Sequence, residues 1–255
     1  MKAKKINKFQ LSNDDLLRYN KHILLEEIQT DGLEILKKKH VAIIGLGGLG
    51  CPVAQYLSTS GLGKITLIDD DVVEETNLQR QILYTSEDLG LYKTDVAYKR
   101  LKVFNPDINI ESYNIRFTNN SAHLIKDVDM IIDATDNFKS RSLINKISLL
   151  FKKPLIMGAA IKMQGQVAVF RNDLSDMPCY NCLYDDIEDE ISSCIDLGVL
   201  STLTGIIGSL QATEAIKTLI GFGESLESKL LLVDLKHMSF RTVKIVKDNK
   251  CKICN

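Results

Sequence analysis

Apolar residues in this chain occur in short runs that alternate with longer amphipathic segments. The runs at 41–44, 64–69, 108–113, 128–133 and 154–158 have the length of buried strands, and helical periodicity falls at 48–60, 93–104, 119–126 and 137–152. This alternation predicts a doubly wound α/β fold with a mostly parallel, Rossmann-like sheet. Ligands of such sheets bind at the carboxyl ends of the strands.

The pattern changes on both sides of this core. Residues 12–27 predict an N-terminal helix with Ser12 and Asp15 as its capping pair. After Gly158, the run 164–170 predicts a strand antiparallel to its neighbour, and helix 200–220 and strands 229–235 and 240–246 follow. We expect one domain over residues 1–255, made of an N-terminal helical arm (12–40), a βα core (41–158) and a C-terminal part with an antiparallel extension of the sheet (159–255).

The turn Gly-Leu-Gly-Gly-Leu-Gly at 45–50 connects the first strand of the core to its first helix. Glycines there let backbone N–H groups approach a phosphate, and the helix adds its positive N-terminal end. Asp69, at the end of the second strand, is placed to accept hydrogen bonds from ribose hydroxyls. The pattern predicts a nucleotide-binding core, without deciding between redox and phosphorus chemistry. The glycines expected to approach the nucleotide are Gly45, Gly47, Gly48 and Gly50.

Composition narrows the classes of partner. The chain has 255 residues, 45% hydrophobic and 25% charged, and its formal net charge of −1 gives no basic field for nucleic acid or anionic membrane. The basic start MKAKKINK is not followed by an apolar segment, so we expect no secretory signal. The apolar stretch 199–220 is interrupted by polar residues and predicts a buried amphipathic helix, not a membrane span. We expect a cytoplasmic protein with no nucleic-acid and no membrane partner.

Four of the six cysteines form two Cys-x-x-Cys pairs, Cys179 with Cys182 and Cys251 with Cys254. In a cytoplasmic chain, four thiolates predict a closed, tetrahedral, structural Zn²⁺ site. Such a site would clasp the C-terminal tail onto the body of the protein. Disulfides, a redox pair and plain buried cysteines are the alternatives.

Further polar features follow the strand ends on the side of the glycine turn. They are Asp69, the peptide Asn-Leu-Gln-Arg-Gln at 77–81, Lys93 and the pair Asp136–Asn137. Taken singly, Arg80 and Lys93 can be surface charges, and Asp136 can cap the next helix. Together they place an amide, two cations and an acid around one site, as a triphosphate with Mg²⁺ requires. The combination predicts ATP and Mg²⁺ in preference to a nicotinamide cofactor.

The order of these motifs resembles one family from about residue 12 to residue 254. RYNKHILL at 18–25, GLGGLG, Asp69, NLQRQ, Lys93, TDN at 135–137, GAAIKMQGQ at 158–166 and both cysteine pairs occur in this order. They are similar to the MoeB/ThiF/HesA family of ubiquitin-activating-enzyme-like adenylyltransferases. The resemblance implies adenylation of the C-terminal Gly-Gly carboxylate of a ubiquitin-like sulfur carrier protein, MoaD- or ThiS-like, with release of pyrophosphate. It leaves open whether the pathway is molybdopterin or thiamine biosynthesis.

The resemblance also implies roles for individual residues. Asn77, Arg80 and Lys93 would contact the phosphates, and Asp136, with Asn137 beside it, would hold Mg²⁺. In a homodimer the arm of one subunit would reach the partner's γ-phosphate. The second arginine of the family pattern is Lys21 here, so this contact would fall to Lys21 or be shared by Arg18. A separate sulfur donor, such as a cysteine desulfurase, would supply the sulfur.

Cys194, in the acidic segment 184–198, matches the family's crossover-loop cysteine, which in some members bonds covalently to the carrier. The alternative is an ordinary loop residue, since the neighbouring Asp189, Glu190 and Asp196 would raise the pKa of its thiol. Three rival functions stay open. They are an NAD(P)-dependent dehydrogenase, activation of a short peptide by adenylation, and a zinc-bearing adaptor that binds nucleotide only as a structural ligand.

Overall fold

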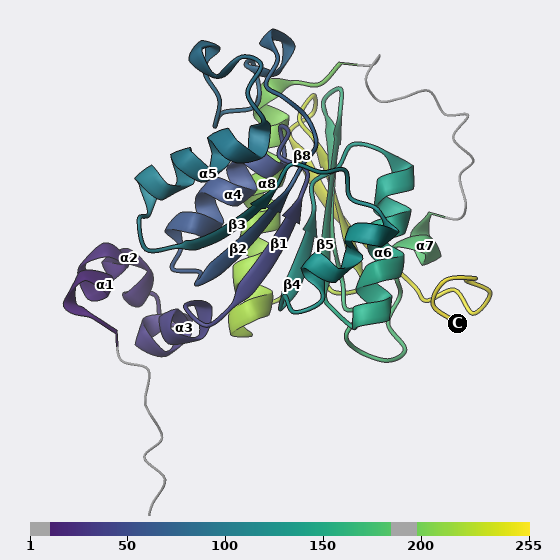
Figure 1. Ribbon diagram of the computed structural model, residues 1–255. Coiled ribbons are helices and arrows are strands. Elements are labelled where there is room, and N and C mark those ends of the chain that lie inside the picture. The colour runs from purple at the N-terminus through teal and green to yellow at the C-terminus, as the bar shows by residue number, and fades with distance from the viewer. Residues whose placement is uncertain (1–10, 185–197) are drawn as a thin grey trace, which may run out of the picture.

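The computed structural model describes residues 11–184 and 198–255. These residues form an eight-stranded sheet with the strand order β3-β2-β1-β4-β5-β6-β7-β8 (Figure 1). The strands are β1 (His40–Ile44), β2 (Lys64–Ile68), β3 (Asn109–Tyr113), β4 (Met130–Asp133), β5 (Leu155–Ile161), β6 (Gln164–Phe170), β7 (Lys229–Asp234) and β8 (Ser239–Lys244). Strands β1 to β5 pair in parallel and β6 to β8 are antiparallel, which confirms the predicted sheet and its C-terminal extension.

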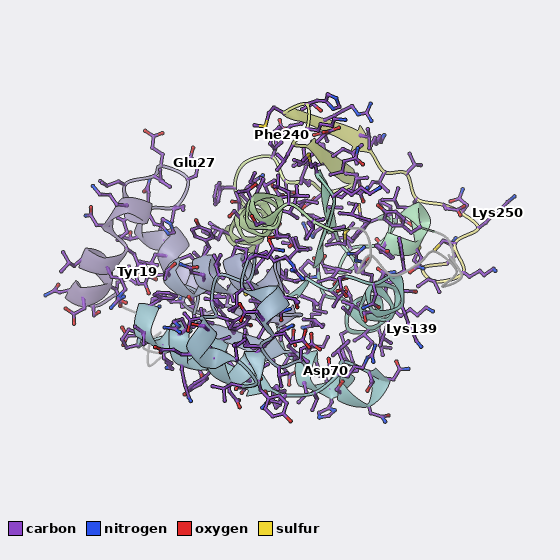
Figure 2. All side chains as sticks on the ribbon, turned by 90° about the horizontal axis from the view of Figure 1, so that it is seen from above. Tyr19, Glu27, Asp70, Lys139, Phe240 and Lys250 are labelled. Carbon is purple, nitrogen blue, oxygen red and sulfur yellow. The ribbon has the colours of Figure 1, made fainter. Side chains whose placement is uncertain are left out.

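Alternating residues of β1 enter two separate core layers. Val41 and Ile43 share a buried cluster with one group of helices, and Ala42 and Ile44 share a second cluster with the helices of the other face. The first group is α4 (Gly50–Thr59), α5 (Lys93–Phe104) and α8 (Ser201–Ile220), and the second is α6 (Phe138–Phe151) with the 3₁₀ helix η3 (Asn119–Ile125). Both faces of the central parallel strands are therefore buried, which is why β1 and β4 are mostly apolar, whereas the edge strand β3 is more polar and only partly buried. Figure 2 shows the helices on both sides of the sheet, so the doubly wound fold is confirmed.

The prediction of a single helix over 12–27 is wrong. The structure has α1 (Asn13–Arg18) and α2 (Asn20–Ile23), separated at Tyr19, and a further helix, α3 (Gln29–Leu36), that was not predicted. Tyr19 is only 4% exposed, and its hydroxyl accepts a hydrogen bond from Nδ2 of Asn105 (3.0 Å). The helix is interrupted where this side chain turns into the body of the protein. The capping pair of Ser12 and Asp15 is confirmed at the start of α1.

The remaining described helices are short. They are α7 (Tyr180–Leu183) and the 3₁₀ helices η1 (Glu75–Asn77) and η2 (Ser86–Asp88). Residues 185–197 of the predicted crossover segment, including Cys194 and its acidic neighbours, lie outside the described residues. Within the described ranges, no helix has both the length and the apolar character needed to span a membrane.

Two glycines of the turn at 45–50 are required by the fold itself. Gly45 has φ 91°, and a Cβ on it would lie 2.8 Å from the carbonyl oxygen of Ala134, which follows β4. A Cβ on Gly50 would lie 2.0 Å from the carbonyl oxygen of Gly45. Helix α4 can therefore begin this close to the ends of β1 and β4 only because neither position carries a side chain.

We expect Gly50→Ala to lower the free energy of unfolding by at least about 2 kcal/mol, because the new methyl group must displace the backbone of the turn. The matched control is Gly205→Ala in α8, where a Cβ would meet nothing within 4 Å. Alanine in a helix interior should stabilise that variant by about 0.5–1 kcal/mol. Urea unfolding measures both changes. A Gly50→Ala variant as stable as the wild type would contradict the close approach described here.

Candidate nucleotide site and cysteine cluster

The strand ends after β1 and β4 lie next to each other where the strand order reverses. β1 pairs with β2 on one side and with β4 on the other. In doubly wound sheets this switch point opens a crevice at the carboxyl edge, and ligands bind there. The glycine turn at 45–50 follows β1, and the segment 135–137 follows β4. The structure therefore places two of the predicted groups on the two sides of the switch point.

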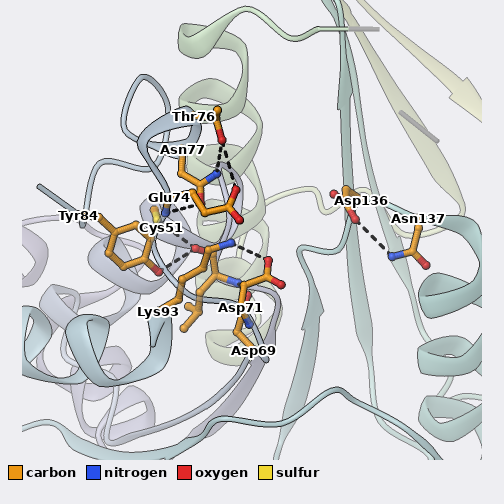
Figure 3. A network of polar contacts seen from close by, with 11 residues as sticks. Cys51, Asp69, Asp71, Glu74, Thr76, Asn77, Tyr84, Lys93, Asp136 and Asn137 are labelled. Atoms are coloured by element: carbon orange, nitrogen blue, oxygen red, sulfur yellow. Dashed lines mark hydrogen bonds and ion pairs between the residues drawn. The ribbon is translucent and has the colours of Figure 1, made fainter. Parts of the chain in front are cut away.

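Leu46, inside the glycine turn, is held by side chains from other segments. Its N–H donates to Oδ2 of Asp69 (2.6 Å), and its carbonyl oxygen accepts from the Tyr84 hydroxyl (2.9 Å) and from Sγ of Cys51 (3.3 Å) (Figure 3). Burial raises the pKa of the Cys51 thiol to about 12 and the pKa of Tyr84 well above its usual value, so both groups keep their protons and remain donors. The turn is thus positioned by hydrogen bonds from outside it.

Asp69 directs its carboxylate at the backbone of the same edge. Besides the N–H of Leu46, it accepts the N–H of Asp71 on Oδ1 (2.9 Å). Burial raises the pKa of Asp69, and the nearby charge of Lys93 opposes that rise. A carboxylate has about four lone-pair directions, so these two bonds leave acceptor positions for ribose hydroxyls.

Lys93 begins α5 and is almost completely buried at this edge. Its Nζ lies 2.7 Å from Oδ2 of Asp71, and its side chain is 5% exposed whereas that of Asp71 is 64% exposed. A buried ammonium group requires a compensating charge, which Asp71 provides in this structure. Asp71 is not among the residues predicted from the sequence. It stands in a run of three acids in the sequence, and in the structure one carboxylate oxygen of each of these acids lies within 4.8 Å of the others.

Asn77 and Arg80 lie on the connection between β2 and α5. Asn77 is buried, and its side-chain amide is engaged locally: Oδ1 accepts the N–H of Glu74 (3.4 Å) and Nδ2 donates to Oγ1 of Thr76 (3.3 Å). Arg80 donates from Nη1 to the carbonyl oxygen of Thr76 (3.0 Å). Asn77 therefore shapes the turn that carries Arg80, a structural role that the sequence analysis did not foresee.

Asp136 lies apart from the group around Lys93, on the segment after β4 (Figure 3). It is exposed, and its Oδ1 accepts from Nδ2 of Asn137 (3.3 Å). The cap of α6 is Asn137, whose Oδ1 accepts the N–H of Ser140 (2.9 Å), so the alternative that Asp136 caps this helix is wrong. Protein-bound Mg²⁺ commonly uses one or two carboxylates together with phosphates and water. An exposed carboxylate that accepts a long hydrogen bond from its neighbour Asn137 suits that donor set.

Two buried ionisable residues, Asp133 and Arg141, hold the segment before Asp136, and neither is among the residues predicted from the sequence. Asp133 accepts the N–H (2.9 Å) and the hydroxyl (2.7 Å) of Thr135, and Arg141 donates to the Thr135 carbonyl oxygen (2.9 Å). Asp133 is fully buried and Arg141 is 7% exposed. Burial raises the pKa of Asp133, and the charge of Arg141 opposes that rise. These contacts hold the backbone directly before Asp136.

Arg18 and Lys21 are not at this edge of their own chain. Arg18 donates from Nη1 to the carbonyl oxygen of Phe104 (3.2 Å), the last residue of α5, whereas Lys93 is the first residue of the same helix. Twelve helical residues separate these ends by about 17 Å. In Figure 1, α1 and α2 lie at the lower left, whereas the blue-teal connection between β2 and α5, which carries Arg80, lies at the top.

The four cysteines of the two pairs converge in space. Sγ of Cys179 lies 3.8 Å from Sγ of Cys251, Sγ of Cys182 lies 3.5 Å from Sγ of Cys254, and the sulfurs of Cys179 and Cys182 are 4.0 Å apart. A tetrahedron with Zn–S bonds of about 2.3 Å has sulfur–sulfur distances of about 3.8 Å. A disulfide bond is about 2.05 Å long. The distances fit a four-thiolate metal site and exclude disulfide bonds in this structure.

The two residues between Cys179 and Cys182 dock on α6. Oδ1 of Asn145 accepts the N–H of Tyr180 (3.3 Å), and Nδ2 of Asn145 donates to Oδ1 of Asn181 (2.9 Å). Asn172 adds a donor to the same Oδ1 (3.0 Å). All of these asparagines are buried, so the cysteine cluster is joined to α6 by a satisfied internal polar network. The tail after β8 lies on the side of the molecule opposite the N-terminal arm, as Lys250 and Tyr19 show in Figure 2.

Comparison with known proteins gives matches along nearly the whole chain. A model of the ThiF family matches residues 19–253. A sulfur carrier protein adenylyltransferase of Thermus thermophilus is 40% identical over 249 residues, which cover 95% of this chain and 92% of the relative. A molybdopterin-synthase adenylyltransferase of Escherichia coli is 40% identical over 246 residues, 96% of this chain and 98% of the relative.

Solved structures agree with these matches. The crystal structure of PaaA superposes with a TM-score of 0.81 at 26% identity and covers 95% of this chain and 78% of its own. Escherichia coli MccB with ATP has a TM-score of 0.81 at 23% identity, covers 98% of this chain and 75% of its own, and supports the fold alone. Because the family model matches residues 19–253 and both adenylyltransferases align with this chain along more than nine-tenths of their length, the chain belongs to the ThiF family.

Proposed function

We propose that this protein is an ATP-dependent adenylyltransferase that activates the C-terminal Gly-Gly carboxylate of a ubiquitin-like sulfur carrier protein. The observation that carries the proposal is the buried cation Lys93 beside the glycine turn, in a chain 40% identical to two adenylyltransferases. Phosphoryl chemistry needs fixed positive charge of this kind, whereas hydride transfer does not. The printed names of the relatives support a sulfur carrier as substrate. The pathway is molybdopterin or thiamine biosynthesis, with sulfur from a separate donor such as a cysteine desulfurase.

In the proposed reaction a carboxylate oxygen of the carrier attacks the α-phosphorus of ATP. The new oxygen–phosphorus bond gives the acyl-adenylate, the bond from the α-phosphorus to its bridging oxygen breaks, and pyrophosphate leaves with that electron pair. A carboxylate is already ionised at neutral pH, so no general base is needed. Negative charge accumulates on the phosphate oxygens, and Lys93 and Arg80 neutralise it.

The other residues bind and orient the nucleotide. Asp69 accepts from the ribose hydroxyls, and the N–H groups of the glycine turn donate to the phosphates. Asp136, with Asn137 beside it, would hold Mg²⁺, and the ion would supply positive charge to the phosphates. Asn77 contributes by shaping the turn of Arg80, as its hydrogen bonds indicate. Covalent capture of the carrier by Cys194 and a cytoplasmic location stay predictions.

We expect the wild-type protein with ATP, Mg²⁺ and a carrier ending in Gly-Gly to form a carrier acyl-adenylate that mass spectrometry detects. Lys93→Met keeps the length of the side chain and removes its charge, and should slow adenylate formation about 10²–10³-fold. The matched control is Lys99→Met, an exposed lysine of the same helix, which should keep the wild-type rate.

The same assay separates the rival functions. Formation of adenylate on MoaD-like and ThiS-like carriers at different rates identifies the pathway. Adenylation of an isolated C-terminal peptide as fast as of the whole carrier favours the short-peptide alternative. Tight NAD(P) binding without any adenylate favours a dehydrogenase, and nucleotide binding without turnover favours an adaptor. Either of these last two results would overturn the proposal.

We also propose that the protein works as a homodimer in which the arm of one subunit completes the phosphate site of the other. Arg18 and Lys21 lie away from the site of their own chain, so they can serve a nucleotide only from a second copy. The neighbouring Leu17 and Leu24 are 81% and 67% exposed, and apolar surface of this kind is typical of subunit contacts.

Mixed dimers test this arrangement. We expect Lys21→Met and Lys93→Met to be poorly active alone, but a one-to-one mixture after subunit exchange should recover about a quarter of the wild-type activity. The recovery arises because half of the dimers are mixed and each has one site with both lysines, one from each subunit. If Lys21→Met alone is fully active, the same mixing is done with Arg18→Met. A monomer in sedimentation, or no recovery in either mixture, contradicts the arrangement.

We further propose that the four cysteines hold one structural Zn²⁺. Elemental analysis should find about one zinc per purified chain, and Cys251→Ser should lose most of it and unfold at a lower temperature. The control is Cys51→Ser, a buried cysteine that donates to Leu46 and lies outside the cluster, which should keep its zinc. Metal-free protein with fewer than the expected free thiols after denaturation would instead favour disulfides or a redox pair.

A further inference from the structure

Gln81 ends the Asn-Leu-Gln-Arg-Gln peptide and has no role in the function proposed above. Gln81 is 3% exposed, and among residues 11–184 and 198–255 its side-chain oxygen Oε1 has no hydrogen-bond partner. A buried amide oxygen without a partner costs stability, and such atoms are rare in folded proteins. The burial of this amide therefore requires a reason.

The amide of Gln81 faces the glycine turn. Nε2 of Gln81 lies 3.8 Å from the position of a Cβ on Gly47, and no other atom beyond the chain neighbours lies within 4 Å of that position in the described part of the chain. Gly47 thus differs from Gly45 and Gly50, since no close protein contact requires it to be glycine. The space over Gly47 is open, and an NH₂ donor borders it.

The backbone fixes this orientation. The N–H of Gln81 donates to the carbonyl oxygen of Asn77 (3.0 Å), and the carbonyl oxygen of Gln81 accepts the N–H of Tyr84 (3.1 Å). Tyr84 in turn donates from its hydroxyl to Leu46, the neighbour of Gly47. Gln81 is therefore held against the glycine turn by contacts that do not involve its own side chain.

We propose that Gln81 is a substrate-contacting residue whose Nε2 donates to a phosphate oxygen of ATP bound over Gly47. An amide NH₂ suits this place because it donates to an anion without adding a second buried charge beside Lys93. The backbone N–H groups of the turn approach the same oxygens from the other side. The inference rests on the proposed function, since it takes ATP as the bound nucleotide.

The test compares a nucleotide that has phosphates with adenosine, which has none. We expect Gln81→Met, which has nearly the same shape but no donor, to raise the Kd for ATP about tenfold, and Gln81→Glu to raise it further by repulsion. The Kd for adenosine should stay within about twofold in both. Isothermal titration calorimetry measures ATP, and competition measures adenosine. The matched control is Gln79→Glu, an exposed glutamine of the same peptide with the same change of charge, which should bind ATP like the wild type.

The outcomes are distinct. Unchanged ATP affinity in Gln81→Met overturns the inference, and so does an equal loss for ATP and adenosine, which assigns Gln81 a structural role. Failure of the wild type to bind ATP overturns the proposed function instead. If thermal unfolding shows that Gln81→Met does not fold, Gln81→Glu, which keeps the shape and a polar end group, carries the same comparison.

Discussion

The hydrogen bonds made by the N–H and the carbonyl oxygen of Leu46 are the interactions on which the rest of the candidate site depends. A turn rich in glycine has almost no side chains with which to fix itself, so its shape must come from its surroundings. Asp69, at the end of β2, accepts a hydrogen bond from the N–H of Leu46. The hydroxyl of Tyr84, on the connection that carries Arg80, donates to the carbonyl oxygen of Leu46. Leu46 therefore connects the glycine turn with Asp69 and with the connection that carries Arg80. The three segments are held relative to one another by the protein's own hydrogen bonds.

The ion pair at this edge joins a buried cation, Lys93, to a mostly exposed acid, Asp71. A buried cation attracts a phosphate more strongly than an exposed cation does, because its surroundings have a lower dielectric constant. Burying a cation without a counter-ion is, however, unfavourable. Asp71 is the counter-ion of Lys93 in this structure. Because Asp71 is mostly exposed, it would leave the ion pair more easily than a buried acid would if the proposed phosphate bound to Lys93.

The sequence predicts those parts of the fold that depend on local patterns of apolar and polar residues. Parallel strands such as β1 and β2 are buried on both faces, so their apolar runs appear directly in the sequence. The prediction of one continuous helix in the arm is wrong because Tyr19 interrupts the helix and contacts Asn105, which is 86 residues away in the sequence. Tyr84 and Gln81 lie on a connection without periodicity, and no local pattern indicates that they reach Leu46 and Gly47. The sequence therefore predicts that the site residues lie together at the strand ends. The contacts between these residues depend on the path of the connection between β2 and α5.

Helix α6 links the cysteine cluster to the candidate nucleotide site. Asn137, Arg141 and Asn145 are spaced four residues apart and so lie on one face of the helix. The first caps the helix beside Asp136, the second holds the Thr135 carbonyl, and the third binds Tyr180 from between two cysteines. The cysteine cluster and the segment before Asp136 are therefore connected to the same face of α6. The cysteine cluster, which includes the C-terminal pair far from the glycine turn in sequence, is joined to the candidate site through one helix and its hydrogen bonds.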